Sequence, residues 1–175
     1  MLNRIKIDLM GLVNEKINIT KIFKLYILNI SAKCSILFRI QDYFTERGFI
    51  LIAKLIRNRN LSLTGAEFCI GCKIEAGLII KHTHGIVVGG GAVIGKNCTI
   101  LQQVTIGENY KYGNNDYPTI KNNVTICSGA KVLGGIIIGN NCIIGANAVV
   151  LKSFEDKSII VGSPATCKKQ KVNKE

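Results

Sequence analysis

Apolar residues recur every six positions from residue 70 to about residue 150. One column has Ile or Val at ten of its twelve places, and seven of those twelve are followed directly by Gly. Its members are Ile70, Ala76, His82, Val88, Ile94, Ile100, Ile106, Ile120, Ile126, Val132, Ile138 and Ile144. A second column, four residues later, is small or aliphatic almost throughout. Each unit of this kind can bury its apolar side only against its neighbours, so the period predicts a parallel β-helix with three strands and three corners per coil.

The period is interrupted at two places, and both interruptions suggest function. His82 occupies a position where aliphatic residues otherwise stand, and an unpaired imidazole buried there would cost about 1 to 3 kcal/mol. We therefore expect His82 to turn toward a cleft and His84 to face outward at its rim. Between Ile106 and Ile120 the stretch GENYKYGNNDYP adds eight residues to one unit. Gly, Asn, Asp and Pro dominate it, which predicts a loop over 108–119.

Residues 1–62 lack the six-residue period and show helical spacing instead. Examples are Leu9, Leu12 and Val13, then Ile36, Leu37 and Ile40, then Ile52, Leu55 and Ile56. This predicts three or four amphipathic helices that pack on one another and on the first coil. Contact of these helices with a membrane surface is the alternative. The β-helix should span 63–166, with a turn at Pro164, and residues 167–175 should form a basic tail.

Charge and cysteine content narrow the choice of partner and compartment. The net charge is +12, but residues 1–60 carry 11 basic and 4 acidic groups and residues 61–175 carry 12 and 7, with no dense basic run. This distribution argues against nucleic acid as a partner. Seven cysteines, an odd number, predict free thiols and a cytoplasmic protein, with the inner face of the membrane as the alternative location. Cys69 and Cys72 have the spacing of a metal or redox pair, but a single pair is weak evidence, and no metal is expected.

Several stretches resemble the serine acetyltransferase branch of the hexapeptide-repeat acyltransferases. They are LIIKHTHGIVVG, ILQQVTIG, CSGAKVLGGIIIGNNCIIGANAVVLK and VGSPA, which together cover about Glu67 to Ala165. The resemblance implies a mostly β fold, a left-handed parallel β-helix with a short α-helical N-terminal region. It also implies a homotrimer that uses acetyl-CoA as co-substrate in a groove between subunits.

The resemblance assigns roles to particular residues. His82 would be the general base, since imidazole titrates near neutrality, and Glu67 would orient it. The acceptor would contact Lys81, Asp116 and Tyr117. The acetyl-CoA groove would map to Gly107, Ser128, Gly129, Ala130, Ala146 and Lys152, with Lys168 and Lys169 near the nucleotide phosphates.

The sequence departs from the serine acetyltransferase pattern where the acceptor would bind. The family has Asp at the position of Lys81 and an Arg-His pair at Asp116 and Tyr117, so two charges are inverted. A zwitterion would meet the wrong charge at both places, unless Lys81 and Asp116 pair with each other. We therefore expect an O-acetyltransferase acting on a sugar hydroxyl in surface polysaccharide synthesis. Serine O-acetyltransferase is the alternative, and a zinc carbonic anhydrase-like β-helix or a purely structural β-helix are more remote ones.

Overall fold

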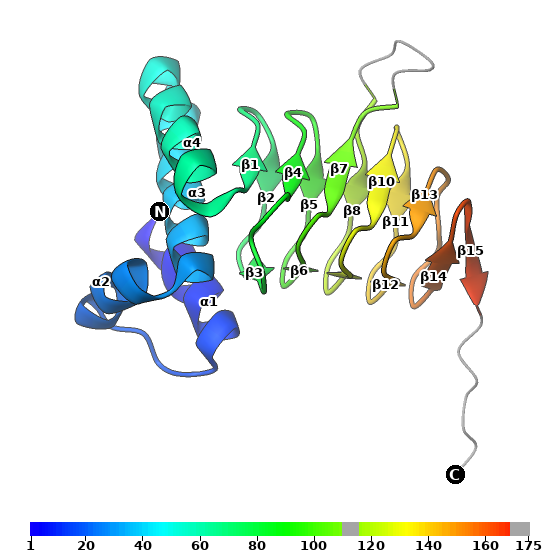
Figure 1. Ribbon diagram of the computed structural model, residues 1–175, viewed down its shortest axis with the longest axis horizontal. Coiled ribbons are helices and arrows are strands. Elements are labelled where there is room, and N and C mark those ends of the chain that lie inside the picture. Colours follow the sequence, from blue (N-terminus) through cyan, green and yellow to red (C-terminus); the bar gives the residue numbers. More distant parts are fainter. Residues whose placement is uncertain (110–115, 169–175) are drawn as a thin grey trace.

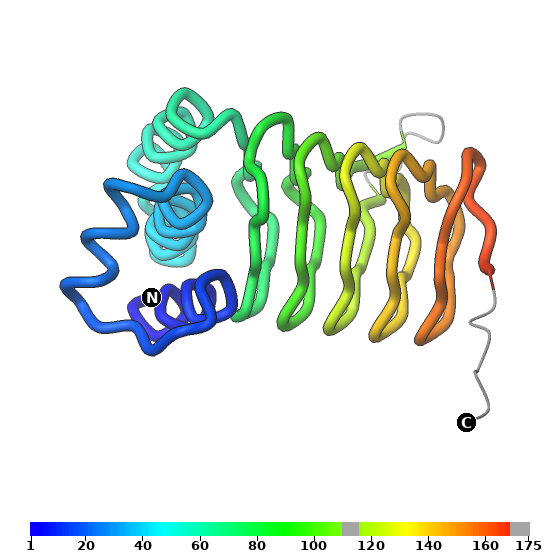
Figure 2. Tube along the Cα trace, turned by 60° about the horizontal axis from the view of Figure 1, so that its bottom comes forward, coloured from blue at the N-terminus to red at the C-terminus, as the bar shows by residue number. Residues whose placement is uncertain are grey.

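Four helices cover one end of a three-sided column of short strands (Figure 1). The computed structural model describes residues 1–109 and 116–168. The helices are α1 (Leu2–Val13), α2 (Ile19–Leu28), α3 (Ile30–Glu46) and α4 (Ile50–Thr64). The column begins two residues after α4 and rises coil by coil away from the helices, as the chain trace shows (Figure 2).

The strands form three sheets, here called faces A, B and C. Face A contains β1 (Glu67–Phe68), β4 (Val87–Val88), β7 (Thr105–Gly107), β10 (Lys131–Leu133) and β13 (Val149–Val150). Face B contains β2 (Lys73–Ile74), β5 (Val93–Ile94), β8 (Thr119–Ile120) and β11 (Ile137–Ile138). Face C contains β3 (Ile79–Ile80), β6 (Thr99–Ile100), β9 (Thr125–Ile126), β12 (Ile143–Ile144), β14 (Ile159–Gly162) and β15 (Ala165–Lys168). Pairing within each face is parallel except between β14 and β15, so the parallel β-helix is confirmed.

The interior of the column consists of aliphatic residues stacked one coil above another. Each strand points one residue inward, and these residues are almost completely buried. The stacks are Phe68, Val88, Ile106, Val132 and Val150 on face A, Ile74, Ile94, Ile120 and Ile138 on face B, and Ile80, Ile100, Ile126, Ile144 and Ile160 on face C. Cys72, Cys98 and Cys142 are buried between the stacks, where free thiols act as small apolar side chains.

The first coil differs from the register that the sequence suggested. Glu67 pairs with Val87, 20 positions on, whereas Val87 pairs with Thr105, 18 positions on. Two extra residues therefore lie in the corner between β3 and β4. The residues that point inward before Val88 are Ile80, Ile74 and Phe68, so the placement of Ile70, Ala76 and His82 in the inward column is wrong. Both registers contain enough Ile to satisfy the period, which is why the sequence did not separate them.

Helix boundaries follow local signals in the sequence. Asn18 and Asn29 begin α2 and α3, and their side chains accept hydrogen bonds from the backbone N–H groups of Lys21 and Ala32. Gly65 ends α4 with φ of 70°, a conformation that glycine adopts at low cost. The helices end at Thr64 rather than at 62, and β15 extends to Lys168 beyond the expected limit of 166.

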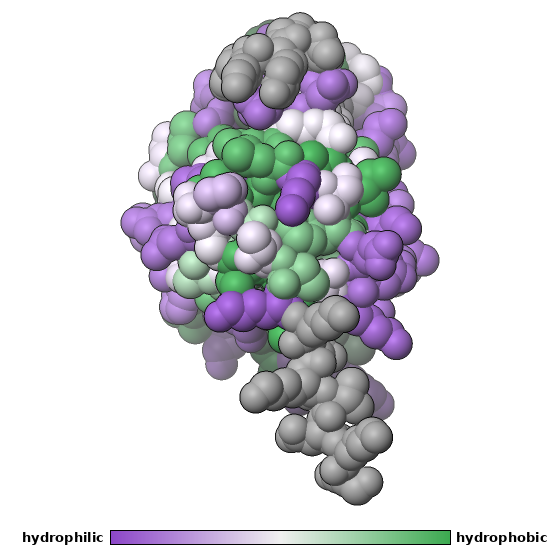
Figure 3. Space-filling model, turned by 90° about the vertical axis from the view of Figure 1, so that its right-hand side faces the viewer, coloured by the Kyte–Doolittle hydropathy of each residue, from purple (hydrophilic) through white to green (hydrophobic). Residues whose placement is uncertain are grey.

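The predicted packing of the helices holds only in part. Leu9, Ile36 and Leu37 are buried, but Ile52 and Leu55 of α4 are exposed. No helix within the described residues is long and apolar enough to cross a membrane. At the opposite end of the column, apolar surface lies at the centre and hydrophilic side chains surround it (Figure 3).

Candidate active site

The two histidines stand on either side of a buried threonine at one corner of the first coil. Thr83 is 1% exposed, and its Oγ1 donates a 2.6 Å hydrogen bond to the carbonyl of Thr64. This bond fixes the corner to the end of α4 and leaves His82 and His84 exposed. The Cδ2 atom of His84 lies 3.2 Å from where a Cβ on Gly65 would stand, so its ring packs on the end of the helix. The imidazole of His82 is therefore available to a ligand, and His84 has the expected outward position.

Part of the predicted acetyl-CoA groove lies along the same edge of the column. This edge, here called the His82 edge, consists of the corners between faces C and A. Backbone hydrogen bonds link its corners in sequence, from Gln103 N–H to the His84 carbonyl, from Gly129 N–H to the Gln102 carbonyl, and from Asn147 N–H to the Ser128 carbonyl. Ser128, Gly129 and Ala146 thus lie in line with the histidine corner. Their small side chains leave room for an extended ligand along this edge.

The other residues predicted to bind acetyl-CoA do not belong to this exposed row. Ala130 is fully buried, so only its backbone could touch a ligand. Gly107 ends β7 on the far side of face A. Lys152 is exposed, with its Nζ 5.6 Å from the centre of the Phe154 ring, and Lys168 is exposed at the end of β15. Lys169 is outside the described residues.

Glu67 lies on face A, where β1 leaves the His82 edge. Its Oε1 is 3.7 Å from Nη1 of Arg57 and 3.9 Å from Sγ of Cys69. His82 is not a partner of Glu67 in these contacts, so the orientation of the imidazole by Glu67 stays a prediction. Burial and the nearby Glu67 carboxylate raise the pKa of the Cys69 thiol, which keeps it protonated.

A groove of about 570 Å³ runs along the outer side of face A. Lys54 and Arg57 of α4 lie at one end of it, and Glu108 and Tyr117 lie at the other. Its floor is formed by Cys69, Ile70, Val87, Gly89, Gly90, Thr105, Ile106, Gly107 and Leu133. Tyr117 and Gly107, predicted from the sequence as acceptor and acetyl-CoA contacts, thus meet in one cavity.

Tyr117 is held against a run of three glycines. A Cβ added to Gly91 would stand 2.8 Å from Cγ of Tyr117, and one added to Gly89 would stand 3.0 Å from its Cδ1. The ring therefore occupies space that any side chain at these two positions would take. The corner between faces A and B, here called the Tyr117 edge, is shaped to seat this tyrosine.

Asp116 and Lys81 lie on different edges. A Cβ on Gly135 would stand 2.9 Å from Cβ of Asp116, and Asp116 lines a hollow of about 180 Å³ with Asn109, Leu133 and Leu151. Lys81 is exposed beside the histidine corner, where its carbonyl accepts a hydrogen bond from Ser31 Oγ. Among the described residues no ion pair joins Lys81 to Asp116, so that pairing is not present within the chain.

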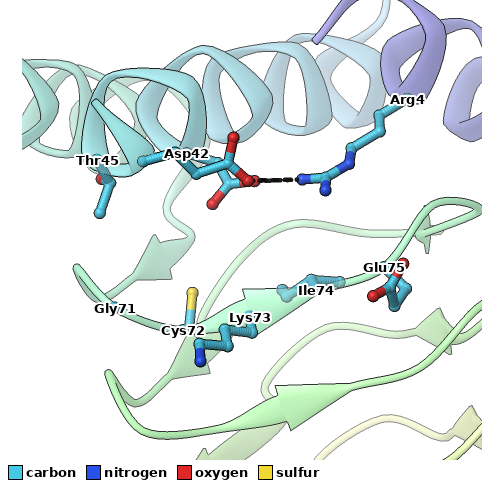
Figure 4. A pocket seen from close by; sticks show the side chains of 9 residues that line it. Arg4, Asp42, Thr45, Gly71, Cys72, Lys73, Ile74 and Glu75 are labelled. Atoms are coloured by element: carbon cyan, nitrogen blue, oxygen red, sulfur yellow. Dashed lines mark hydrogen bonds and ion pairs between the residues drawn. The ribbon is translucent and has the colours of Figure 1, made fainter. Parts of the chain in front are cut away.

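A further hollow of about 330 Å³ lies between the helices and β2 (Figure 4). Arg4 of α1 reaches across it to Asp42 of α3 at 3.0 Å and to Glu46 at 3.2 Å. Arg4, Asp42 and Glu46 thus pair with each other, and none of the predicted site residues lines this hollow. In the part of the chain that the structure describes, no group of three or more His, Cys, Asp or Glu side chains could hold a metal ion.

Comparisons with known proteins agree with this geometry. Residues 117–152 match the family model "Bacterial transferase hexapeptide (six repeats)". A serine acetyltransferase from Helicobacter pylori is 39% identical over 128 residues, which cover 73% of this chain and 75% of that protein. The chain belongs to the serine acetyltransferase family. The left-handed β-helix with a short α-helical N-terminal region is thereby confirmed.

Two solved serine acetyltransferases share the fold. The Brucella abortus enzyme in complex with coenzyme A has a TM-score of 0.85 and 26% identity, over 95% of this chain and 66% of that one. The soybean enzyme complexed with serine has a TM-score of 0.78 and 29% identity, over 82% of this chain and 59% of that one. The chain spans between about half and three quarters of the length of the curated relatives it matches.

The expectation of a sugar acceptor is wrong. Relatives from several bacteria, matched over most of this chain, are serine acetyltransferases. The expectation rested on the inverted charges at Lys81 and Asp116, but both residues are exposed. They also lie on different edges of the chain, so the inverted charges do not define one acceptor pocket within it.

Sequence reasoning also missed the residues that α4 contributes. Lys54 and Arg57 are three positions apart and therefore share a side of the helix. Their spacing was visible in the sequence, but nothing there indicated that this side of α4 overlooks face A. The run Gly89–Gly91 was a signal that could have been used, since three successive glycines at a corner indicate a close neighbour.

Proposed function

We propose that this protein is a serine O-acetyltransferase, which moves the acetyl group of acetyl-CoA to the hydroxyl of L-serine. The observation that carries the proposal is the exposed imidazole of His82, in line with the small residues Ser128, Gly129 and Ala146 on one edge of the β-helix. An extended thioester lying along this edge would present its carbonyl to an acceptor beside His82.

In this reaction His82 accepts the proton of the serine hydroxyl while that oxygen attacks the thioester carbon. The tetrahedral intermediate then collapses, the carbon–sulfur bond breaks, and the imidazolium returns the proton to the sulfur of CoA. The products are O-acetylserine and free CoA. The protein positions the two substrates and supplies the base. The reaction as written involves no change of oxidation state and requires no metal ion.

The test is a thiol-release assay with acetyl-CoA and L-serine. His82→Ala should lower kcat by roughly a hundredfold or more, because general base catalysis typically contributes that much. The affinity for acetyl-CoA, measured by calorimetry, should change only slightly. His84→Ala, at the same exposed corner, is the matched control and should keep most of the activity. Unchanged turnover in His82→Ala, or an equal loss in His84→Ala, would refute the assignment.

We also propose that the working form is a homotrimer with sites between subunits. His82 and Tyr117 lie on opposite edges of face A, and the four or five extended residues between these edges span roughly 15 Å. Serine is too short to touch both edges of one chain. A second subunit that brings its Tyr117 edge to the His82 edge of the first would complete the site.

Mixed trimers test this arrangement. His82→Ala and Tyr117→Ala chains, each weakly active alone, should recover part of the activity when co-expressed, because one site in a mixed trimer can then have both intact edges. Sedimentation should give the mass of three chains. Complementation that fails in trimers proven to be mixed would place the whole site within one chain.

A further inference from the structure

The groove on face A contains two cations that the reaction outlined above does not use. Lys54 and Arg57 project from α4 into the same cavity as Tyr117. Arg57 contacts the carboxylate of Glu67, which belongs to the strand β1 that begins at the His82 edge. Arg57 thus lies beside the residue that is predicted to orient His82.

The contacts that Arg57 makes with the described residues are all long. Its Nη1 is 3.7 Å from Glu67, and its Nε and Nη2 are 3.4 Å and 3.3 Å from the side-chain oxygen of Asn58. Hydrogen bonds to a guanidinium are ordinarily 2.7 to 2.9 Å long when the partner is a carboxylate. The buried Arg39 shows the contrast, with four hydrogen bonds between 2.6 and 3.2 Å.

Lys54 is exposed and, within residues 1–109 and 116–168, makes no hydrogen bond or ion pair. A planar guanidinium with unused donors and an ammonium one turn away form a site that suits a carboxylate. Glu108, at the other end of the groove, gives the cavity a negative group as well. Because serine is too short to span the groove, only the cationic end of the groove can contact the same serine molecule as His82.

We infer that Arg57, assisted by Lys54, binds the carboxylate of the acceptor amino acid. This inference rests on the proposed function and names the group that selects a free amino acid over other hydroxyl compounds. The carboxylate replaces the long contacts of Arg57 with short, charge-assisted ones. The selectivity of the protein for a free amino acid therefore comes from helix α4, and not from the loop residues Asp116 and Tyr117.

The test compares L-serine with L-serinamide, which lacks the carboxylate, as acceptors for Arg57→Gln. A charge-assisted hydrogen bond is worth enough that the KM for serine should rise roughly ten- to a hundredfold. The KM for serinamide and the KM for acetyl-CoA should stay within a few-fold of wild type. Arg57→Lys should recover part of the serine affinity, and Lys54→Gln should raise the KM for serine by a smaller factor. Arg59→Gln, on an exposed side of the same helix, is the matched control and should behave as wild type.

Different failures have different meanings. An equal loss with serine and serinamide would show that Arg57 acts through Glu67, and would overturn the inference while leaving the serine acetyltransferase proposal intact. A raised KM for acetyl-CoA would assign the cations to a phosphate of CoA, with the same consequence. Absence of serine acetylation by the wild-type protein would instead overturn the proposed function, and the inference with it.

Discussion

Each coil of the β-helix repeats the contacts of the coil below it, whereas the helical region is attached through contacts that occur once. In the column, one aliphatic residue per strand stacks on its equivalent from the next coil. At the base of the column, the carboxylate of Asp8 accepts hydrogen bonds from Ser35, Arg39 and the backbone of Gly77 and Leu78, all within 3.2 Å. Repetition spreads stability over many similar interactions, and the single cluster concentrates it.

The cluster around Asp8 joins three parts of the chain. Asp8 belongs to α1 and Arg39 to α3, and Arg39 also donates to the carbonyls of Ile74 and Glu75 in the first coil. Both side chains are at most 1% exposed. A buried ion pair therefore fastens the helices to the open end of the column. The ring of Phe38 also packs against that of Phe68, with 4.7 Å between the ring centroids.

The largest effect is expected when one member of this pair is removed. Asp8→Ala leaves the guanidinium of Arg39 buried without its counter-charge, which typically costs about 3 to 5 kcal/mol. Urea unfolding followed by circular dichroism should show this loss. Arg4→Ala breaks only a half-exposed pair and should cost at most about 1 kcal/mol. If both substitutions cost the same, the cluster has no special role in attaching the helices.

The β-helix and the helical region also differ in how much of their structure could be predicted from the sequence. The column was predictable because its aliphatic stacks recur. The period is therefore still evident when one unit departs from it. The errors in it, at Ile70, Ala76 and His82, all lie in the first coil, where two extra residues shift the register and no coil below constrains it. The role of His82 as an exposed residue was still expected, because an imidazole does not fit an aliphatic stack.

The helical region could be predicted only as helices. Which sides of the helices would be buried depended on pairs such as Asp8 and Arg39, which are 31 positions apart, and on the contact between α4 and face A. The same difference applies to the residues of the candidate active site. Its β-helix members His82, Ser128, Gly129 and Ala146 were found from motifs, whereas Lys54 and Arg57 depend on the placement of a helix.

A smaller loss of stability is expected when a corner residue of the β-helix is replaced, because similar corners recur in every coil. Asn123 lies at a corner between faces B and C with φ of 57°, and its amide donates to Asn141 at 3.2 Å, while Asn97 donates to it at 3.4 Å. Asn123→Ala loses these bonds and places a Cβ in the left-handed region, at a cost of about 1 to 2 kcal/mol. Asn123→Gly loses the same hydrogen bonds, but glycine adopts a positive φ at low cost. It should therefore lower the free energy of unfolding by less than Asn123→Ala does. A greater cost for Gly than for Ala in thermal unfolding would contradict this account of the corner.

The smallest effect is expected at a second carboxylate of the helical region, which sharpens the contrast with Asp8. Burial, and then the charge of Glu46, raise the pKa of Asp42, so its ionised form is disfavoured in the folded protein despite its contact with Arg4. Asp42→Asn should therefore change the free energy of unfolding by less than about 1 kcal/mol at neutral pH. A group whose pKa is raised on folding binds its proton more tightly in the folded state. As the pH falls from 7 toward 4, wild type should thus gain stability relative to Asp42→Asn in urea unfolding. The opposite trend would mean that Asp42, like Asp8, stabilises the fold as an anion.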